Sequence, residues 1–159
     1  MLIFLATLFP RILVFWGWHL IMAVLGGLIM SINGLFQSRG ASEFGAMVVL
    51  VLSLLSVILY FWVMRRTSAK TLKSTTEGWE FAIGGTIPMI LLILLALYFR
   101  SLTPYNTIRY GFTLLPVSLP FQGWIEAVYP ALPFHILALS VPLVFIAGVV
   151  SGTSGKPKG

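Results

Sequence analysis

The sequence predicts an all-α membrane protein, a bundle of four transmembrane helices. Four long apolar runs support this prediction, at residues 12–35, 44–64, 81–99 and 132–150. Each is close to the roughly 20 helical residues that cross the hydrocarbon core of a bilayer. Hydrophobic residues make up 58% of the chain and charged residues only 9%, whereas soluble domains carry about 25% charged residues. The chain has too little polar sequence to cover four such helices in water, so we expect them to face lipid.

The first span, residues 12–35, follows the apolar stretch Leu2–Phe9 and the pair Pro10-Arg11. A signal peptide has its basic residues first and a shorter apolar run, so we interpret this span as retained. One helix from Leu2 to Leu35 would be about 51 Å long, far more than roughly 30 Å of hydrocarbon. We therefore expect the helix to begin at Pro10, where a missing N–H costs nothing, and Leu2–Phe9 to lie along the interface.

The small residues Ala23, Gly27 and Ser31 follow each other at four-residue spacing in the first span. Small residues at this period form a flat strip on a helix, where another helix backbone can approach closely. One interpretation is packing within the protein's own bundle. The other is a contact face for a second copy or for a partner membrane protein.

The segment after the second span holds the densest cluster of cations in the sequence, Arg65, Arg66, Lys70 and Lys73. Short loops rich in Lys and Arg stay in the cytoplasm, and with four spans both termini are then cytoplasmic as well. Of the ten Lys and Arg residues, seven lie inside under this arrangement and three lie outside: Arg39, Arg100 and Arg109. Orientation alone explains the cluster, and binding of anionic lipid headgroups is a further possibility.

The net charge of +6 would suggest nucleic acid as the partner of a soluble protein. Here the cations flank membrane spans, so we expect anionic headgroups on the cytoplasmic side and no nucleic acid. Next to them, at the inner end of the second span, stand Tyr60, Phe61 and Trp62. Aromatic side chains of this kind favour the headgroup level of the membrane.

The third and fourth spans contain signals for helix starts and bends. Ser74 and Glu77 have the spacing of a capping box at the start of the third span. Pro88 and Pro142 each remove a backbone hydrogen bond and should bend their helices. The tail, residues 151–159, is rich in Gly, Ser and Lys, and we expect it to be flexible and cytoplasmic.

The outer segment, residues 101–131, joins the last two spans and is not an ordinary polar loop. It combines several prolines with many large apolar residues and few charges, which argues against both a fifth span and a disordered linker. We expect an interfacial or partly re-entrant structure. Re-entrant backbone is allowed only where protein covers its polar groups.

Titratable groups that could support chemistry are few. His19 lies well inside the first span, and intramembrane ionisable residues are functional candidates, although a neutral histidine bonded to a neighbouring helix is an equally good interpretation. Haem between His19 and His135 would need both at one depth, and the sequence places them at different depths. Near the outer boundary Arg109, Glu126 and His135 could converge for acid–base chemistry, or Glu126 and Arg109 could form a plain ion pair. The chain has no cysteine, which excludes thiolate catalysis and thiolate metal sites, and it has no Gly-rich phosphate loop, HExxH or GxSxG motif. We therefore predict no catalytic, cofactor or metal site.

Three hypotheses for function follow. The leading one is a non-enzymatic subunit, assembly factor or regulator of a larger membrane complex, with a membrane protein or copies of itself as partner. The second is a component of an oligomeric transporter or channel, with His19 along the route. The third is a membrane enzyme acting on a lipid or envelope substrate at the outer interface. Small size, the charge bias and the lack of a eukaryotic targeting signal favour a bacterial cytoplasmic membrane.

Overall fold

The structure, a computed structural model, describes residues 2–38, 40, 42–102, 117–121 and 134–157. In these residues every regular element is helical: α1 (Leu2–Ser38), α2 (Ser42–Thr71), α3 (Thr75–Leu102), η1 (Leu119–Phe121), α6 (Phe134–Ala138) and α7 (Ser140–Thr153). Four stretches of them are long and apolar enough to cross a membrane: Pro10–Phe36, Glu43–Thr71, Thr75–Phe99 and Ile136–Thr153. The predicted all-α fold with four membrane-spanning helices is confirmed, and the chain is a multi-pass membrane protein.

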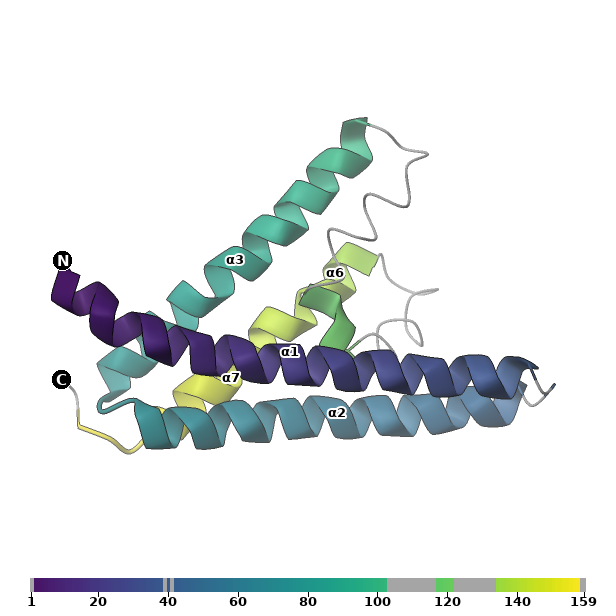
Figure 1. The fold of residues 1–159 in the computed structure, drawn as a ribbon, viewed down its shortest axis with the longest axis horizontal. Helices are drawn as coiled ribbons and strands as arrows, with labels where there is room; N and C mark the ends of the chain where they lie inside the picture. The colour runs from purple at the N-terminus through teal and green to yellow at the C-terminus, as the bar shows by residue number, and fades with distance from the viewer. Residues whose placement is uncertain (1, 39, 41, 103–116, 122–133, 158–159) are drawn as a thin grey trace.

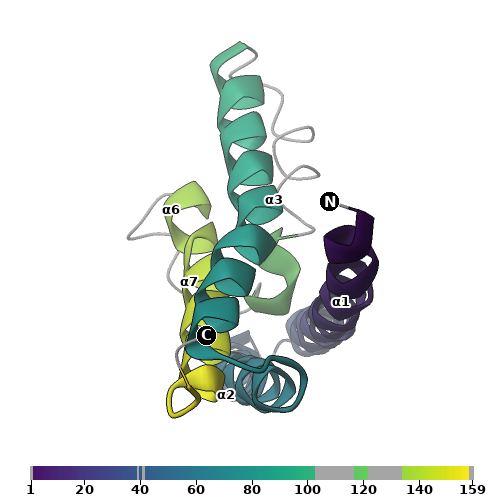
Figure 2. The same ribbon diagram turned by 90° about the vertical axis from the view of Figure 1, so that its left-hand side faces the viewer.

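The two longest helices, α1 and α2, run antiparallel and lie side by side over much of their length, and the N-terminal part of α1 diverges from α2 (Figures 1 and 2). Helix α7 packs against α2, and α3 packs against α7. Helix α3 meets the others at one end of the molecule and diverges from α1 and α2 toward the opposite end (Figures 1 and 2).

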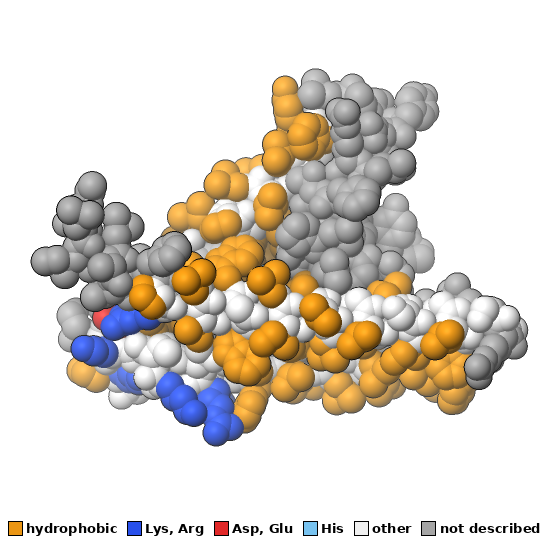
Figure 3. All heavy atoms as spheres, viewed as in Figure 1, with side chains coloured by type: hydrophobic (Ala, Val, Ile, Leu, Met, Phe, Trp, Pro, Cys, Tyr) orange, Lys and Arg blue, Asp and Glu red, His pale blue; other side chains and the backbone are white. Residues whose placement is uncertain are grey.

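The Lys and Arg side chains that the structure describes gather at the end where the four helices meet (Figure 3). We call this end the basic end, and its cations are Arg11, Arg65, Arg66, Lys70, Lys73 and Lys156. Three aromatic rings close the core there: Phe15 of α1 lies 4.6 Å from Phe81 of α3 and 6.1 Å from Phe145 of α7, between ring centroids. These contacts hold α1, α3 and α7 together near the basic end.

Helix α1 corrects one expectation from the sequence. The helix begins at Leu2 and continues through Pro10, so the prediction of a helix start at Pro10 is wrong. Proline removes one hydrogen bond from a helix interior. Ending the helix at Pro10 would leave several backbone N–H groups without an intrahelical partner, so the continuous helix costs less.

The structure bears differently on the two predicted proline bends. Helix α3 is one continuous helix that contains Pro88, and a bend there stays a prediction. The fourth span is divided at Leu139, between α6 and α7, three residues before Pro142. Pro142 has no N–H to donate to the carbonyl of Ala138, and its ring crowds that carbonyl. At the break, the Leu139 N–H donates to Ile136 O, three residues back instead of four, at 3.1 Å.

The closest helix contact is between α2 and α7, and two glycines make it possible. A Cβ atom at Gly148 would overlap the Met64 side chain, and one at Gly152 would overlap Ser68 Oγ and the Arg65 carbonyl. Glycines four residues apart let helix backbones approach in this way. We did not predict this pair from the sequence, although its Gly-x-x-x-Gly spacing was the available signal.

Replacing Gly152 by alanine should destabilise the protein by roughly 1–3 kcal/mol, because the added methyl group meets backbone atoms of α2 that cannot move aside. The control is Gly84→Ala on α3, where nothing lies within 4 Å of the new Cβ. Alanine favours helix over glycine, so the control should be neutral or slightly stabilising. Thermal unfolding of both variants in the same detergent measures the difference, and equal stability would show that the α2–α7 contact is looser than described.

Candidate functional site

A group of buried polar residues lies near the middle of α1 and α2. His19 of α1 is 1% exposed and Tyr60 of α2 is fully buried, and the His19 Nδ1 atom and the Tyr60 hydroxyl oxygen are 2.9 Å apart. Ser53 and Ser56 of α2 are buried beside them on the same face of the helix. Apolar surroundings make such hydrogen bonds costly to lose, so the group fixes α1 against α2.

Tyr60 was expected at headgroup level, with its ring facing the lipid headgroups. The side chain is instead fully buried, so the ring faces the core of the protein. Its ring also packs edge-on against Phe121, with centroids 5.3 Å apart. Trp16 packs edge-on against His19 at 5.2 Å from the other side.

The outer segment reaches this buried group. The short helix η1 lies against α1 and α2, and Val117, Ser118 and Phe121 are each at most 1% exposed. The Ser56 hydroxyl donates to the Pro120 carbonyl at 3.2 Å, as well as to Ser53 O at 2.8 Å. Because Ser56 is at the midpoint of α2, residues 117, 118, 120 and 121 are buried at the level of the middle of that helix. The path of the rest of the segment lies outside the described residues, so the interfacial or re-entrant structure stays a prediction.

The chemistry open to this buried group is limited. Among the described residues no set of three His, Asp or Glu side chains could hold a metal ion, and no carboxylate accompanies His19 in the contacts given above. Within the same residues the Ser53 hydroxyl is buried without a hydrogen-bond partner. The geometry therefore favours a structural polar contact, with one unused hydroxyl beside it.

The basic end holds a second set of polar contacts, centred on Glu77. The Glu77 N–H donates to Ser74 Oγ at 3.1 Å, which confirms the predicted helix cap at the start of α3. The Glu77 carboxylate accepts the Lys73 N–H at 2.6 Å and pairs with the Arg11 guanidinium at 3.3 Å. The cap therefore also joins α3 to α1.

The tail that we expected to be flexible contributes to this end. Helix α7 continues three residues past the predicted end of the fourth span, to Thr153. The Thr75 hydroxyl donates to the carbonyls of Thr153 and Lys156. Lys156 Nζ donates to Ala69 O and Leu72 O, where a cation stabilises the end of α2. Residues 158–159 lie outside the described part.

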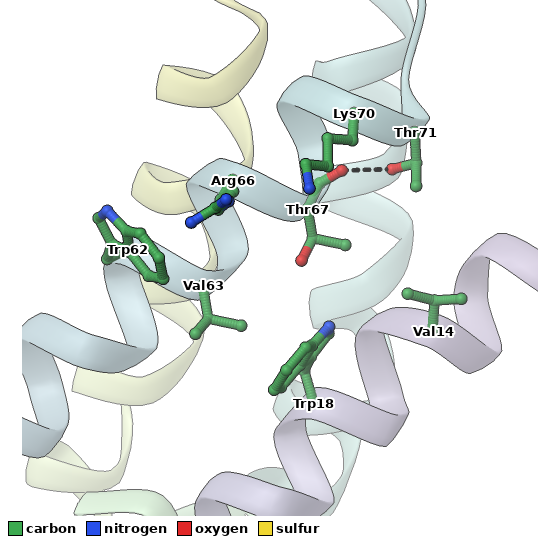
Figure 4. Close-up of a pocket in the computed structure, with 8 residues that line it drawn as sticks. All are labelled: Val14, Trp18, Trp62, Val63, Arg66, Thr67, Lys70 and Thr71. Carbon is green, nitrogen blue, oxygen red and sulfur yellow. Dashed lines mark hydrogen bonds between the residues drawn. The ribbon is translucent and has the colours of Figure 1, made fainter.

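The four cations of the predicted headgroup cluster separate into two pairs. Arg66 and Lys70 line a groove between α1 and α2 (Figure 4). Arg65 and Lys73 are exposed and do not line it. Sequence spacing alone did not reveal this division.

The strip on α1 lies outside the packing face of its helix. The packing face in this half of α1 consists of Met22, Gly26 and Ile29, which are buried. Ala23 and Gly27 are half-buried and Ser31 is exposed. At 100° per residue, the centre of this strip lies roughly 130° around the helix axis from the centre of the packing face. The Ser31 hydroxyl donates to Gly27 O within α1, at 3.0 Å.

The remaining candidates cannot be brought together from the described residues. Arg109 and Glu126 lie outside them, and His135 is in α6 with its side chain undescribed. Their predicted convergence at the outer boundary stays a prediction.

The chain matches no family model, no curated protein and no solved structure.

The His19–Tyr60 contact predicts a coupling energy in a double-mutant cycle. His19→Ala and Tyr60→Phe, alone and together, should give a coupling of about 0.5–2 kcal/mol in the free energy of unfolding, the range of contacting residues and membrane hydrogen bonds. Tyr98→Phe is the matched control, since Tyr98 is exposed on α3. Its effect on the free energy of unfolding should add to that of His19→Ala without a coupling energy. Additivity of the His19 and Tyr60 changes would contradict the hydrogen bond.

Proposed function

We propose that this protein is a non-enzymatic subunit, assembly factor or regulator of a larger membrane complex, and that the strip Ala23, Gly27 and Ser31 is its contact face. The observation that supports the proposal is the division of α1 into two faces. Helix α1 buries Met22, Gly26 and Ile29 within the protein and leaves the strip half-buried or exposed.

The physical argument concerns what drives helices together in lipid. Lipid tails are as apolar as leucine, so exposed Leu20, Val24 and Leu28 beside the strip need no partner. Close packing of small residues does provide a driving force, because backbones can approach and make many contacts. A flat strip that the protein's own packing face does not include is therefore suited to a helix from another chain.

The proposal includes a location and an orientation. The membrane is the bacterial cytoplasmic membrane, with the basic end and both termini in the cytoplasm. The bias of Lys and Arg toward one end supports this, because cation-rich short segments stay inside.

A second candidate, a component of an oligomeric transporter or channel, draws support from the buried polar group. Buried backbone of the outer segment at the level of Ser56, next to His19, is an arrangement that transport proteins use where irregular backbone lines a cavity. Under this candidate, solute flux into proteoliposomes depends on His19. The third candidate, an enzyme using Glu126 and His135, stays a hypothesis from the sequence.

Gly27→Leu should remove the partner without unfolding the protein. A leucine side chain at this half-buried position would prevent another helix backbone from approaching the strip closely. We expect the amount of partner recovered by native co-purification in mild detergent to fall about tenfold, which corresponds to about 1.4 kcal/mol of binding free energy. Mass spectrometry identifies the partner, either another protein or a second copy of this chain.

Gly84→Leu provides the control, because it introduces the same side chain at an exposed glycine of α3. It should leave partner recovery unchanged. A wild-type protein that purifies only as a monomer, together with unaltered behaviour of Gly27→Leu in cells, would count against the proposal.

A further inference from the structure

A groove of about 390 Å³ lies between α1 and α2 at the basic end (Figure 4). This volume is within the roughly 300–1,000 Å³ of small-molecule sites. Helix α1 contributes Val14 and Trp18 to its lining. Helix α2 contributes the other six residues: Trp62, Val63, Arg66, Thr67, Lys70 and Thr71.

The groove is amphipathic along its length. Trp62 and Val63 lie one helical turn deeper in the span than Arg66 and Thr67, and Lys70 lies a further turn toward the end of α2. Val14 and Trp18 of α1 form the facing wall. The charged rim is therefore at headgroup level, and the apolar walls continue into the hydrocarbon.

The cations at the rim have no acid opposite them in the groove. Its lining contains no Asp or Glu, and Glu77, the nearest acid in sequence, pairs with Arg11 and the Lys73 N–H. The Arg66 guanidinium lies 4.9 Å from the centre of the Trp62 ring, a cation–π contact that holds it at the groove. Arg66 and Lys70 are four residues apart and share one face of α2.

We propose that this groove binds one anionic glycerophospholipid of the adjacent leaflet. Its phosphate would bind Arg66 and Lys70, and an acyl chain would lie against Trp18, Val14 and Val63. Charge complementarity supports an anion, because two cations meet here without a carboxylate. A soluble phosphate would leave the apolar walls unused, and Val14, Trp18 and Trp62 are 44%, 38% and 48% exposed, which makes them accessible to lipid from the membrane.

The site is distinct from the general attraction of a basic loop to an anionic leaflet. Arg65 and Lys73 carry the same charge in the same stretch of sequence but do not line the groove. A diffuse attraction would depend on all four cations alike. The proposed site depends on Arg66 and Lys70 alone, which supplies a matched control.

Native mass spectrometry of delipidated protein in detergent, titrated with phosphatidylglycerol, tests this. We expect one phosphatidylglycerol per chain, bound more tightly than phosphatidylcholine. The double variant Arg66→Gln, Lys70→Gln should weaken phosphatidylglycerol binding about tenfold, since each cation beside an anionic headgroup raises the affinity several-fold. Arg65→Gln with Lys73→Gln, an equal loss of charge, should weaken it less than about twofold, because exposed charges outside the site are screened.

Two further arms keep the test decisive. Val14→Trp fills the groove without changing charge and should also weaken phosphatidylglycerol binding, which covers the case in which the double variant fails to fold. Glycerol phosphate, the headgroup without its chains, should not compete. Equal losses in the two double variants, unaltered binding by Val14→Trp, effective competition by glycerol phosphate, or equal affinity for phosphatidylcholine would each overturn the site.

Discussion

In the hydrocarbon core of a membrane no water is available to bond a backbone N–H or C=O, so each of these groups must find its partner within the protein. Two features of this chain follow from that constraint. The fourth span breaks at Leu139, where Pro142 prevents the regular bond to Ala138.

The pairing of the Pro120 backbone is the second consequence. Residues 117, 118, 120 and 121 are buried at the level of the middle of α2, where the Ser56 hydroxyl donates to the Pro120 carbonyl. The same region holds the His19–Tyr60 contact. A short segment and two helices thus share one polar centre in an apolar bundle, which explains why polar residues are kept at a depth where they are costly.

The sequence made the spans and the helix cap predictable, because length, hydropathy and capping are local properties. It could not show which small-residue strip packs inside the protein, since Gly148 with Gly152 and Ala23 with Gly27 have the same spacing. It also could not show that Tyr60 faces the protein core, because that depends on where His19 and Phe121 lie. The division of the four cations into groove and surface pairs depends on where α1 lies, which no local pattern specifies.

Because the chain has no cysteine, single cysteines can measure the depth of the predicted re-entrant segment directly. Cysteine at position 118 should resist a membrane-impermeant maleimide applied from either side of the membrane, since Ser118 is fully buried. Cysteines at the exposed positions 38 and 154, at opposite ends of the bundle, should label from opposite sides. Labelling at 118 from one side as readily as at 38 would contradict a buried re-entrant segment between α1 and α2.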